Sequence, residues 1–218
     1  PQSHAHVKED LMAEAVIVAA ARTPIGRAFK GSLTTVRPDD LAAGVVRAAL
    51  DQVPGLDPTT IDDLYLGCAE PWGEHGFNMA RVVSVLLGLD EVPGATINRF
   101  CASSVQTTRQ AFHAIKAGEG EVFISAGVEC VSRYADFAGA GQSRTEWQNP
   151  RFADAVARTQ ETAATNATWT DPREQGHLPD VYIAMGQTAE NVATAHGISR
   201  QRQDEWGVTS QNRAEAAI

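Results

Sequence analysis

One cysteine occupies a position from which its thiol could act as a nucleophile. Cys101 follows a short apolar run at residues 95–98 and precedes a helical pattern that runs from Ser103 to Ala117 and ends at Gly118. The first amides of a helix have no partners within it, and the aligned peptide dipoles make that end electropositive. The thiolate form of a cysteine is favoured there, and nucleophilic catalysis needs that form. The alternative is a small, buried, apolar side chain, which is a common role for a lone cysteine.

The other two cysteines indicate neither a metal site nor a disulfide framework. Cys68 and Cys130 lie far from Cys101 in the sequence, and no Cys-x-x-Cys pair occurs. We expect both to be structural, and we expect no bound metal. Residues 1–13 are expected to form an unpatterned N-terminal arm.

The composition is that of a folded protein with a net negative charge. Hydrophobic residues make up 43% of the chain and charged residues 21%, and the formal net charge is −9. Nucleic-acid binding is not expected, because it relies on lysine and arginine to neutralise phosphates. Charged residues precede the first apolar run, and no apolar stretch is long enough to span a bilayer. We therefore expect a cytoplasmic protein that does not bind membranes.

Strand and helix patterns alternate over residues 14–131. The continuous apolar run Ala15–Ala21 is typical of a strand buried on both faces of a parallel sheet. Further strands are predicted at residues 62–67, 95–98 and 121–127, and helices at residues 38–53, 78–87 and 103–117. We expect the inner face of the third helix to carry Val105, Phe112 and Ile115. The alternation predicts an α/β fold with a parallel sheet and right-handed crossovers.

The composition changes after Ser132. Gly, Ser, Thr, Gln and Asn dominate the stretch that follows, which indicates a lid or an inserted subdomain. Helical patterns return at residues 186–196 and from Ser199 onward. We expect an α/β domain at residues 14–131 and a loop or lid domain at residues 132–218. The final helical pattern has no capping residue, so we expect the second domain to be truncated.

Five segments of the chain carry motifs with defined spacing. They are Arg22-Thr-Pro-Ile-Gly26, Gly76-Phe-Asn-Met-Ala-Arg81, Asn98-Arg-Phe-Cys-Ala-Ser-Ser104, Ala126-Gly-Val-Glu-Cys-Val-Ser132 and Met185-Gly-Gln-Thr-Ala-Glu-Asn191. In this order they resemble the thiolase family, which comprises acetyl-CoA acetyltransferases and 3-ketoacyl-CoA thiolases. The similarity runs from about Glu14 to Ile218, and five matches in the right order argue against chance.

The resemblance implies the N-terminal βαβαβαβ half of a thiolase-like fold, with a parallel-rich sheet and part of a loop domain, but without the C-terminal half. It implies an acyltransferase of fatty acid metabolism, in which Cys101 holds the acyl group as a thioester during thiolytic cleavage of a 3-ketoacyl-CoA or the reverse Claisen condensation. Met185 is expected to contact the substrate, although a core role for this side chain stays open. Coenzyme A and acyl-CoA are substrates, so no permanently bound cofactor is expected. The family forms homodimers or homotetramers.

The chain also departs from the family pattern. The family's catalytic histidine in a Gly-His-Pro segment and its second cysteine in a Cys-x-Gly-Gly segment do not occur in these 218 residues. His113 lies about 15 Å from Cys101 along its predicted helix, which is too far for it to act as the base. We expect this chain alone to have little thiolase activity. Ala184 stands where short-chain thiolases commonly have histidine, which favours a bulkier or longer acyl chain.

Other functions remain open on the sequence. A related condensing enzyme, such as a ketoacyl synthase or a hydroxymethylglutaryl synthase, shares the doubled α/β fold and a cysteine at a helix start. The Arg-Thr-Pro and Met-Gly-x-Thr-Ala-Glu-Asn segments favour a thiolase over these enzymes. A non-catalytic scaffold would keep the fold without the chemistry. A redox sensor built on Cys101 would need a resolving cysteine, and none is close in the sequence.

Overall fold

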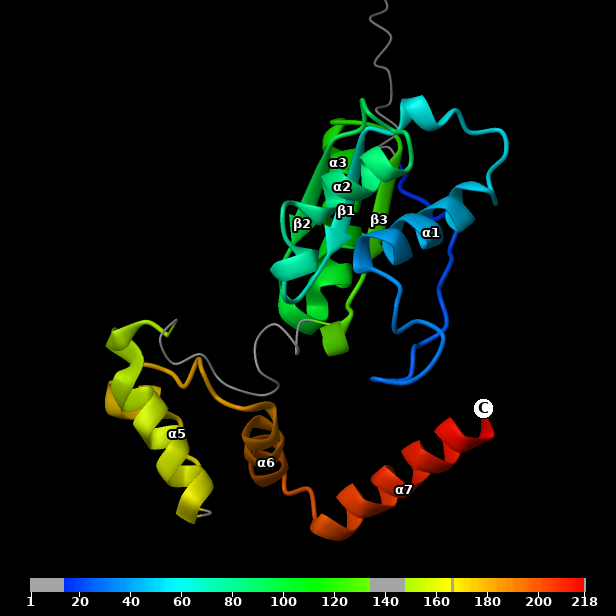
Figure 1. The fold of residues 1–218 in the computed structure, drawn as a ribbon. Helices are drawn as coiled ribbons and strands as arrows, with labels where there is room; N and C mark the ends of the chain where they lie inside the picture. Colours follow the sequence, from blue (N-terminus) through cyan, green and yellow to red (C-terminus); the bar gives the residue numbers. More distant parts are fainter. Residues whose placement is uncertain (1–13, 134–147, 166, 218) are drawn as a thin grey trace, which may run out of the picture. The chain divides into compact units, whose positions relative to one another are not determined.

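The computed structural model describes residues 14–133, 148–165 and 167–217. The chain divides into two units, residues 1–142 and residues 143–218 (Figure 1). The expected N-terminal arm, residues 1–13, lies outside the described residues. The expected domain boundary after residue 131 stays a prediction.

Three parallel strands form the centre of the first unit. β1 (Asp63–Gly67), β2 (Gly94–Ile97) and β3 (Phe123–Gly127) lie in the order β2-β1-β3 (Figure 1). Leu66 of β1 pairs with Thr96 of β2 and with Ala126 of β3. The predicted α/β fold with a parallel sheet is confirmed.

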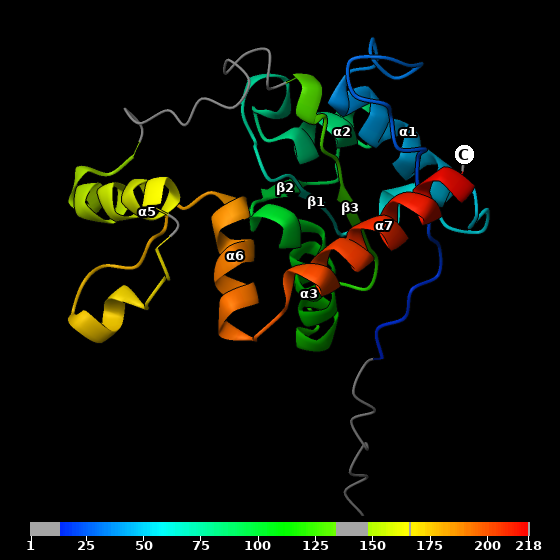
Figure 2. The same cartoon turned by 90° about the horizontal axis from the view of Figure 1, so that it is seen from below.

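Helices cover both faces of this sheet. α1 (Pro38–Leu50) and α2 (Met79–Leu86) lie on one face, and α3 (Ser103–Ala117) lies on the other (Figure 2). α1 begins at a proline followed by two aspartates, whose charge suits the positive end of a helix. α3 ends at Gly118, whose φ of 74° is a left-handed conformation that glycine adopts without steric cost. Short 3₁₀ helices are η1 (Pro58–Thr60), η2 (Gly73–His75) and η3 (Phe100–Ala102).

The hydrophobic core of this unit lies between the sheet and the helices α1 and α2. Leu64 and Leu66 of β1 are fully buried there, as are Met79 and Val83 of α2. Burying a side chain of this size contributes about 1.5–3 kcal/mol. The complete core cluster is Ala42, Ala43, Val46, Ile61, Leu64, Leu66, Cys68, Met79, Ala80, Val83, Leu89 and Val92.

α3 packs on the opposite face through small residues. Its buried residues are Ser103, Thr107, Ala111 and Ala114. Val105 is 71% exposed and Phe112 is 46% exposed, so the expectation that they mark the inner face is wrong. The reason is the short distance between helix and sheet, because only small side chains fit between two backbones that lie this close.

The close contact occurs where β1 and β3 end in glycine. A Cβ atom built on Gly67 would lie 2.8 Å from the backbone nitrogen of Ser104, and one built on Gly127 would overlap the Ser104 hydroxyl. Side-chain carbons do not approach other atoms this closely, so neither position has room for a side chain. The two glycines therefore set how near the first turn of α3 lies to the sheet.

The apolar run Ala15–Ala21 is not a strand, which corrects the prediction. It has no ladder partner within the described part of the chain, and its side chains include Ile17, which is 81% exposed. A strand needs a neighbouring strand with free backbone groups. An apolar pattern indicates a tendency toward burial and does not identify that neighbour.

The second unit is helical in its described residues. α6 (Met185–Ala195) and α7 (Arg200–Ala216) confirm the two helices predicted there. α5 (Ala153–Thr165) falls in a stretch for which no helix is predicted. Its buried residues, Ala155 and Thr159, are too small or too polar to produce a clear apolar period. Two further 3₁₀ helices are η5 (Pro150–Phe152) and η6 (Pro172–Gln175).

Polar contacts hold α5 to its surroundings. Arg158 donates hydrogen bonds to the Asp180 carboxylate at 2.6 Å and to the Leu178 carbonyl at 2.9 Å. Gln187 of α6 donates to the Thr159 carbonyl at 2.6 Å, which joins α6 to α5.

None of the helices in the described residues has the length and apolar character needed to cross a membrane.

The glycine at the end of β1 can be tested by substitution. We expect Gly67→Ala to lower the free energy of unfolding by about 1–3 kcal/mol, because the added carbon forces the start of α3 away from the sheet. Gly44→Ala, in open space within α1, is the matched control and should raise stability by about 0.5–1 kcal/mol. Urea unfolding measures both variants, and equal stability of Gly67→Ala and the unmodified chain would refute the close contact.

Candidate nucleophile site

Cys101 lies in a tight turn between β2 and α3. The turn contains Phe100, whose φ of 46° is in the left-handed region that residues with a side chain rarely adopt. The Asn98 side-chain oxygen accepts a hydrogen bond from the Phe100 amide at 2.8 Å. The Ser103 hydroxyl accepts one from the Arg99 amide at 2.9 Å and donates one to the Phe100 carbonyl at 2.6 Å. Side chains on both sides of Phe100 therefore hold the turn.

The turn presents the Cys101 side chain to solvent at one edge of the sheet. Cys101 is exposed and unbonded to another cysteine. It follows β2, so it lies at the carboxyl edge of the parallel strands, together with the segments that follow β1 and β3. Open α/β sheets bind their ligands outside this edge.

The other two thiols differ from Cys101 in their surroundings. Cys68 is fully buried, and burial, with the nearby Glu129 carboxylate, raises its pKa to about 12. Burial also raises the pKa of Cys130, which is partly buried. The structure thus offers a single solvent-exposed thiol.

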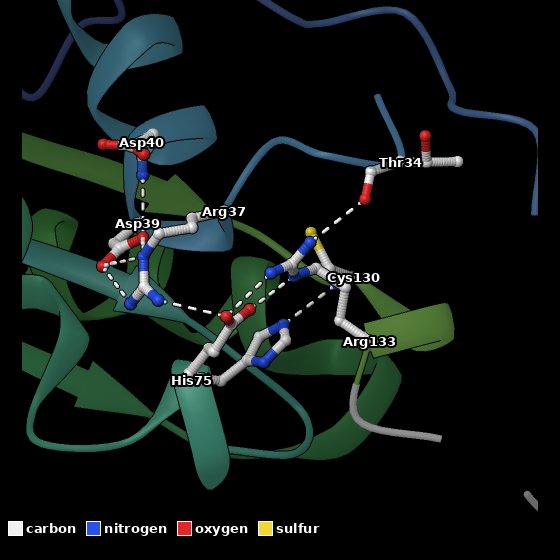
Figure 3. A network of polar contacts seen from close by, with 8 residues as sticks. Thr34, Arg37, Asp39, Asp40, His75, Cys130 and Arg133 are labelled. Atoms are coloured by element: carbon white, nitrogen blue, oxygen red, sulfur yellow. Dashed lines mark hydrogen bonds and ion pairs between the residues drawn. The ribbon is translucent and has the colours of Figure 1, made fainter. Parts of the chain in front are cut away.

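A polar network joins the beginning of α1 to the segments that follow β1 and β3 (Figure 3). Glu74 accepts hydrogen bonds from Arg37 at 3.0 Å and from Arg133. Arg37 also pairs with Asp39 at 2.9 Å, and Arg133 donates to the Thr34 carbonyl at 3.1 Å. The hydrogen bond from Arg133, with the two positive charges, holds the pKa of Glu74 below its usual range.

Two further contacts link the segments that follow β1 and β3. The Glu129 carboxylate accepts hydrogen bonds from the amides of Ala69 at 2.7 Å and Glu70 at 3.3 Å. The His75 Nε2 atom accepts one from the Cys130 amide at 3.0 Å (Figure 3). Glu129 and Cys130 belong to one of the five motif segments of the sequence. The motif does not indicate the residues that these two contact, because those residues lie about sixty positions away in the sequence.

His75 is a buried titratable group within this network. It is 1% exposed. Burial lowers its pKa, and this effect outweighs the opposing effect of Glu129 and Glu74. Because Nε2 accepts a hydrogen bond, the ring is neutral and carries its proton on Nδ1.

Met185, the expected substrate contact, is the first residue of α6 and is 69% exposed. It belongs to the second unit, whereas Cys101 belongs to the first. The Thr188 hydroxyl lies 3.8 Å from its sulfur. Its role toward the substrate stays a prediction.

Within residues 14–133, 148–165 and 167–217, no group of three or more His, Cys, Asp or Glu side chains is arranged to hold a metal ion.

Comparison with known proteins identifies similar sequences along nearly the whole chain. The family model for the thiolase N-terminal domain matches residues 15–218. The chain is 40% identical over 208 residues to a 3-ketoacyl-CoA thiolase of Bacillus subtilis (strain 168), with 95% of this chain and 46% of the relative covered. It is 41% identical over 208 residues to a beta-ketoadipyl-CoA thiolase of Pseudomonas knackmussii, with 94% and 49% covered. The chain spans about half the length of the curated relatives it matches.

Thiol labelling tests the exposure of the site. We expect iodoacetamide near neutral pH to modify Cys101 first, because Cys68 is buried with a raised pKa and Cys130 is partly buried with a raised pKa. Peptide mass mapping after brief exposure identifies the modified residue, and Cys101→Ser should remove the label. Labelling of Cys68 as fast as Cys101 would contradict the structure.

The buried histidine makes stability depend on pH. The folded chain resists protonation of His75, whereas the unfolded chain takes up the proton below about pH 6.5. The free energy of unfolding should therefore fall with acidification from about pH 6.5, by up to about 1.4 kcal/mol per pH unit, until the lowered pKa is passed. Urea unfolding across this range should show a smaller slope for His75→Gln than for His113→Gln, an exposed control. An unchanged slope in His75→Gln would contradict the assignment.

Proposed function

This chain belongs to the thiolase family, and on that premise we propose that its protein is an acyl-CoA C-acyltransferase in which Cys101 receives the acyl group. The observation that carries the proposal is the exposed Cys101 thiol in the turn directly before α3, at the carboxyl edge of a parallel sheet. The relatives named 3-ketoacyl-CoA thiolase and beta-ketoadipyl-CoA thiolase support the class of reaction.

In the degradative direction, the Cys101 thiolate attacks the 3-keto carbonyl of a 3-ketoacyl-CoA. The bond between the second and third carbons breaks, and its electron pair stays on the second carbon, which takes up a proton to give acetyl-CoA. The shortened acyl group remains on the cysteine sulfur as a thioester. The thiolate of free coenzyme A then attacks this thioester, which releases acyl-CoA and the Cys101 thiolate. The reverse sequence condenses two acyl-CoA molecules.

The turn around Cys101 supports two features of this reaction. The Cys101 side chain is accessible, which a bulky thioester substrate needs. The Cys101 amide is the second amide of η3, a position at which a backbone amide has no intrahelical partner, so it is available to stabilise the oxyanion of the tetrahedral intermediate.

Coenzyme A thioesters enter this proposal as substrates, with no permanently bound cofactor. We also propose a homodimer or homotetramer in the cytoplasm. The three free cysteines support a reducing compartment, and the resemblance to thiolases supports the assembly.

The acyl chain is proposed to be longer than that of acetoacetyl-CoA. Ala184 precedes α6 and carries no side chain that could hydrogen-bond a short polar substrate. The adjacent Met185 is flexible and apolar, which suits contact with a hydrocarbon chain.

The covalent intermediate is the direct test of the reaction class. We expect the protein expressed from its complete reading frame to gain the mass of one acetyl group on the peptide that contains Cys101 after incubation with acetyl-CoA. Cys101→Ser should gain none, and neither Cys68 nor Cys130 should carry the group. An acyl group on another residue, or its absence in the folded unmodified protein, would refute the proposal.

Substrate choice is tested on the same protein. We expect kcat/KM to be higher for longer linear 3-ketoacyl-CoAs than for acetoacetyl-CoA, because the side chain at position 184 is small and apolar. Ala184→His should shift the preference toward acetoacetyl-CoA by about tenfold, the value of one or two good polar contacts. Ala184→Ser, which adds a polar group of small volume, separates polarity from size. A clear preference of the unmodified protein for acetoacetyl-CoA would contradict the proposal.

A further inference from the structure

The left-handed residue next to the nucleophile needs an explanation. Phe100 has a side chain, and such residues pay a steric cost at a φ of 46°. Phe100 is 66% exposed, so packing of its side chain does not repay that cost. The surrounding hydrogen bonds must therefore hold this conformation.

Two side chains supply these hydrogen bonds. The Asn98 side-chain oxygen accepts a hydrogen bond from the Phe100 amide. The Ser103 hydroxyl donates one to the Phe100 carbonyl and accepts one from the Arg99 amide. Both peptide groups that flank the Phe100 α-carbon are thus fixed. A backbone bond from the Ala102 amide to the Arg99 carbonyl at 3.0 Å closes the turn across Cys101.

Ser103 does not have the usual role of a serine at a helix start. A capping hydroxyl accepts a bond from an amide two or three residues further along the chain. The Ser103 hydroxyl instead accepts from Arg99, four residues earlier, and the residue at the capping position is Ala102, which makes no side-chain bond. Ser103 is only 4% exposed and uses its hydroxyl both as donor and as acceptor. It is therefore not available to touch a substrate.

We propose that Ser103 is a positioning residue: its hydroxyl holds Phe100 in the left-handed conformation, and this directs the Cys101 thiol toward the thioester carbonyl. This inference rests on the function proposed above. Loss of the hydroxyl lets Phe100 return to a negative φ, which rotates the following residue and misaligns the sulfur. A small displacement of a reacting group can cost about 10²-fold in rate.

The test compares two reactions of the same thiol in the protein from the complete reading frame. Acyl transfer from acetyl-CoA needs an oriented thiol, whereas alkylation by iodoacetamide, a small reagent, needs only an accessible one. In Ser103→Ala we expect single-turnover acyl transfer to fall by about 10²-fold with little change in KM, and alkylation of Cys101 to continue at nearly the original rate. Ser103→Thr, which keeps a hydroxyl, should restore much of the transfer rate.

Ser104→Ala is the matched control, because it removes the next hydroxyl of the same helical turn and leaves the bonds around Phe100 in place. If Ser103→Ala does not fold by circular dichroism, Asn98→Ala, which removes only the bond to the Phe100 amide, takes its place with the same expected result. Equal transfer rates in the unmodified and substituted proteins would overturn the positioning role alone. Absence of any acyl group on Cys101 in the unmodified protein would overturn the proposed function and this role with it.

Discussion

The close contact between the first turn of α3 and the glycine ends of β1 and β3 is the constraint on which the site depends. Gly67 and Gly127 have no side chains, so the backbone around Ser104 rests almost directly on the sheet. Ser103 is thereby buried where its hydroxyl can reach back to Arg99 and Phe100. Cys101, two residues earlier, is left exposed at the carboxyl edge.

The close contact between α3 and the sheet also explains why the sequence predicts the elements of this unit but not the inner face of α3. The strands at the centre of the sheet and the bounds of α3 follow from local signals, namely apolar runs and a glycine at a helix end, and the structure confirms them. The orientation of α3 could not be predicted in this way. A sequence pattern assigns the largest apolar residues, such as Phe112, to the inner face, but close packing against a glycine-ended sheet selects small residues such as Ala111. Burial there depends on volume as well as on apolarity.

The run Ala15–Ala21 shows the other limit of pattern reading. Its apolarity indicates that burial would be favourable, but pairing depends on a neighbouring strand that the run itself does not specify. Likewise, the position of Cys101 before a predicted helix is enough to make it a candidate nucleophile. The conformation of the turn that exposes its side chain could not be predicted from the sequence. That turn depends on the left-handed Phe100 and on hydrogen bonds from Asn98 and Ser103, which appear only in three dimensions.

The polar contacts between the segments after β1 and β3 give the carboxyl edge its rigidity. Glu129, Glu74 and His75 each bind a group about sixty residues away in the sequence. These contacts hold the two segments in one arrangement, and the one formed by His75 is buried. The edge beside Cys101 is thus built from contacts that join distant parts of the sequence.

The most direct test of this constraint is the rate of acyl transfer to Cys101 when the glycine contact is altered. In the protein from the complete reading frame, single-turnover transfer from acetyl-CoA should fall by about 10²-fold in folded Gly67→Ala and stay unchanged in Gly44→Ala, since only the former displaces the start of α3. An unchanged transfer rate in folded Gly67→Ala would contradict the claim that this contact positions Cys101.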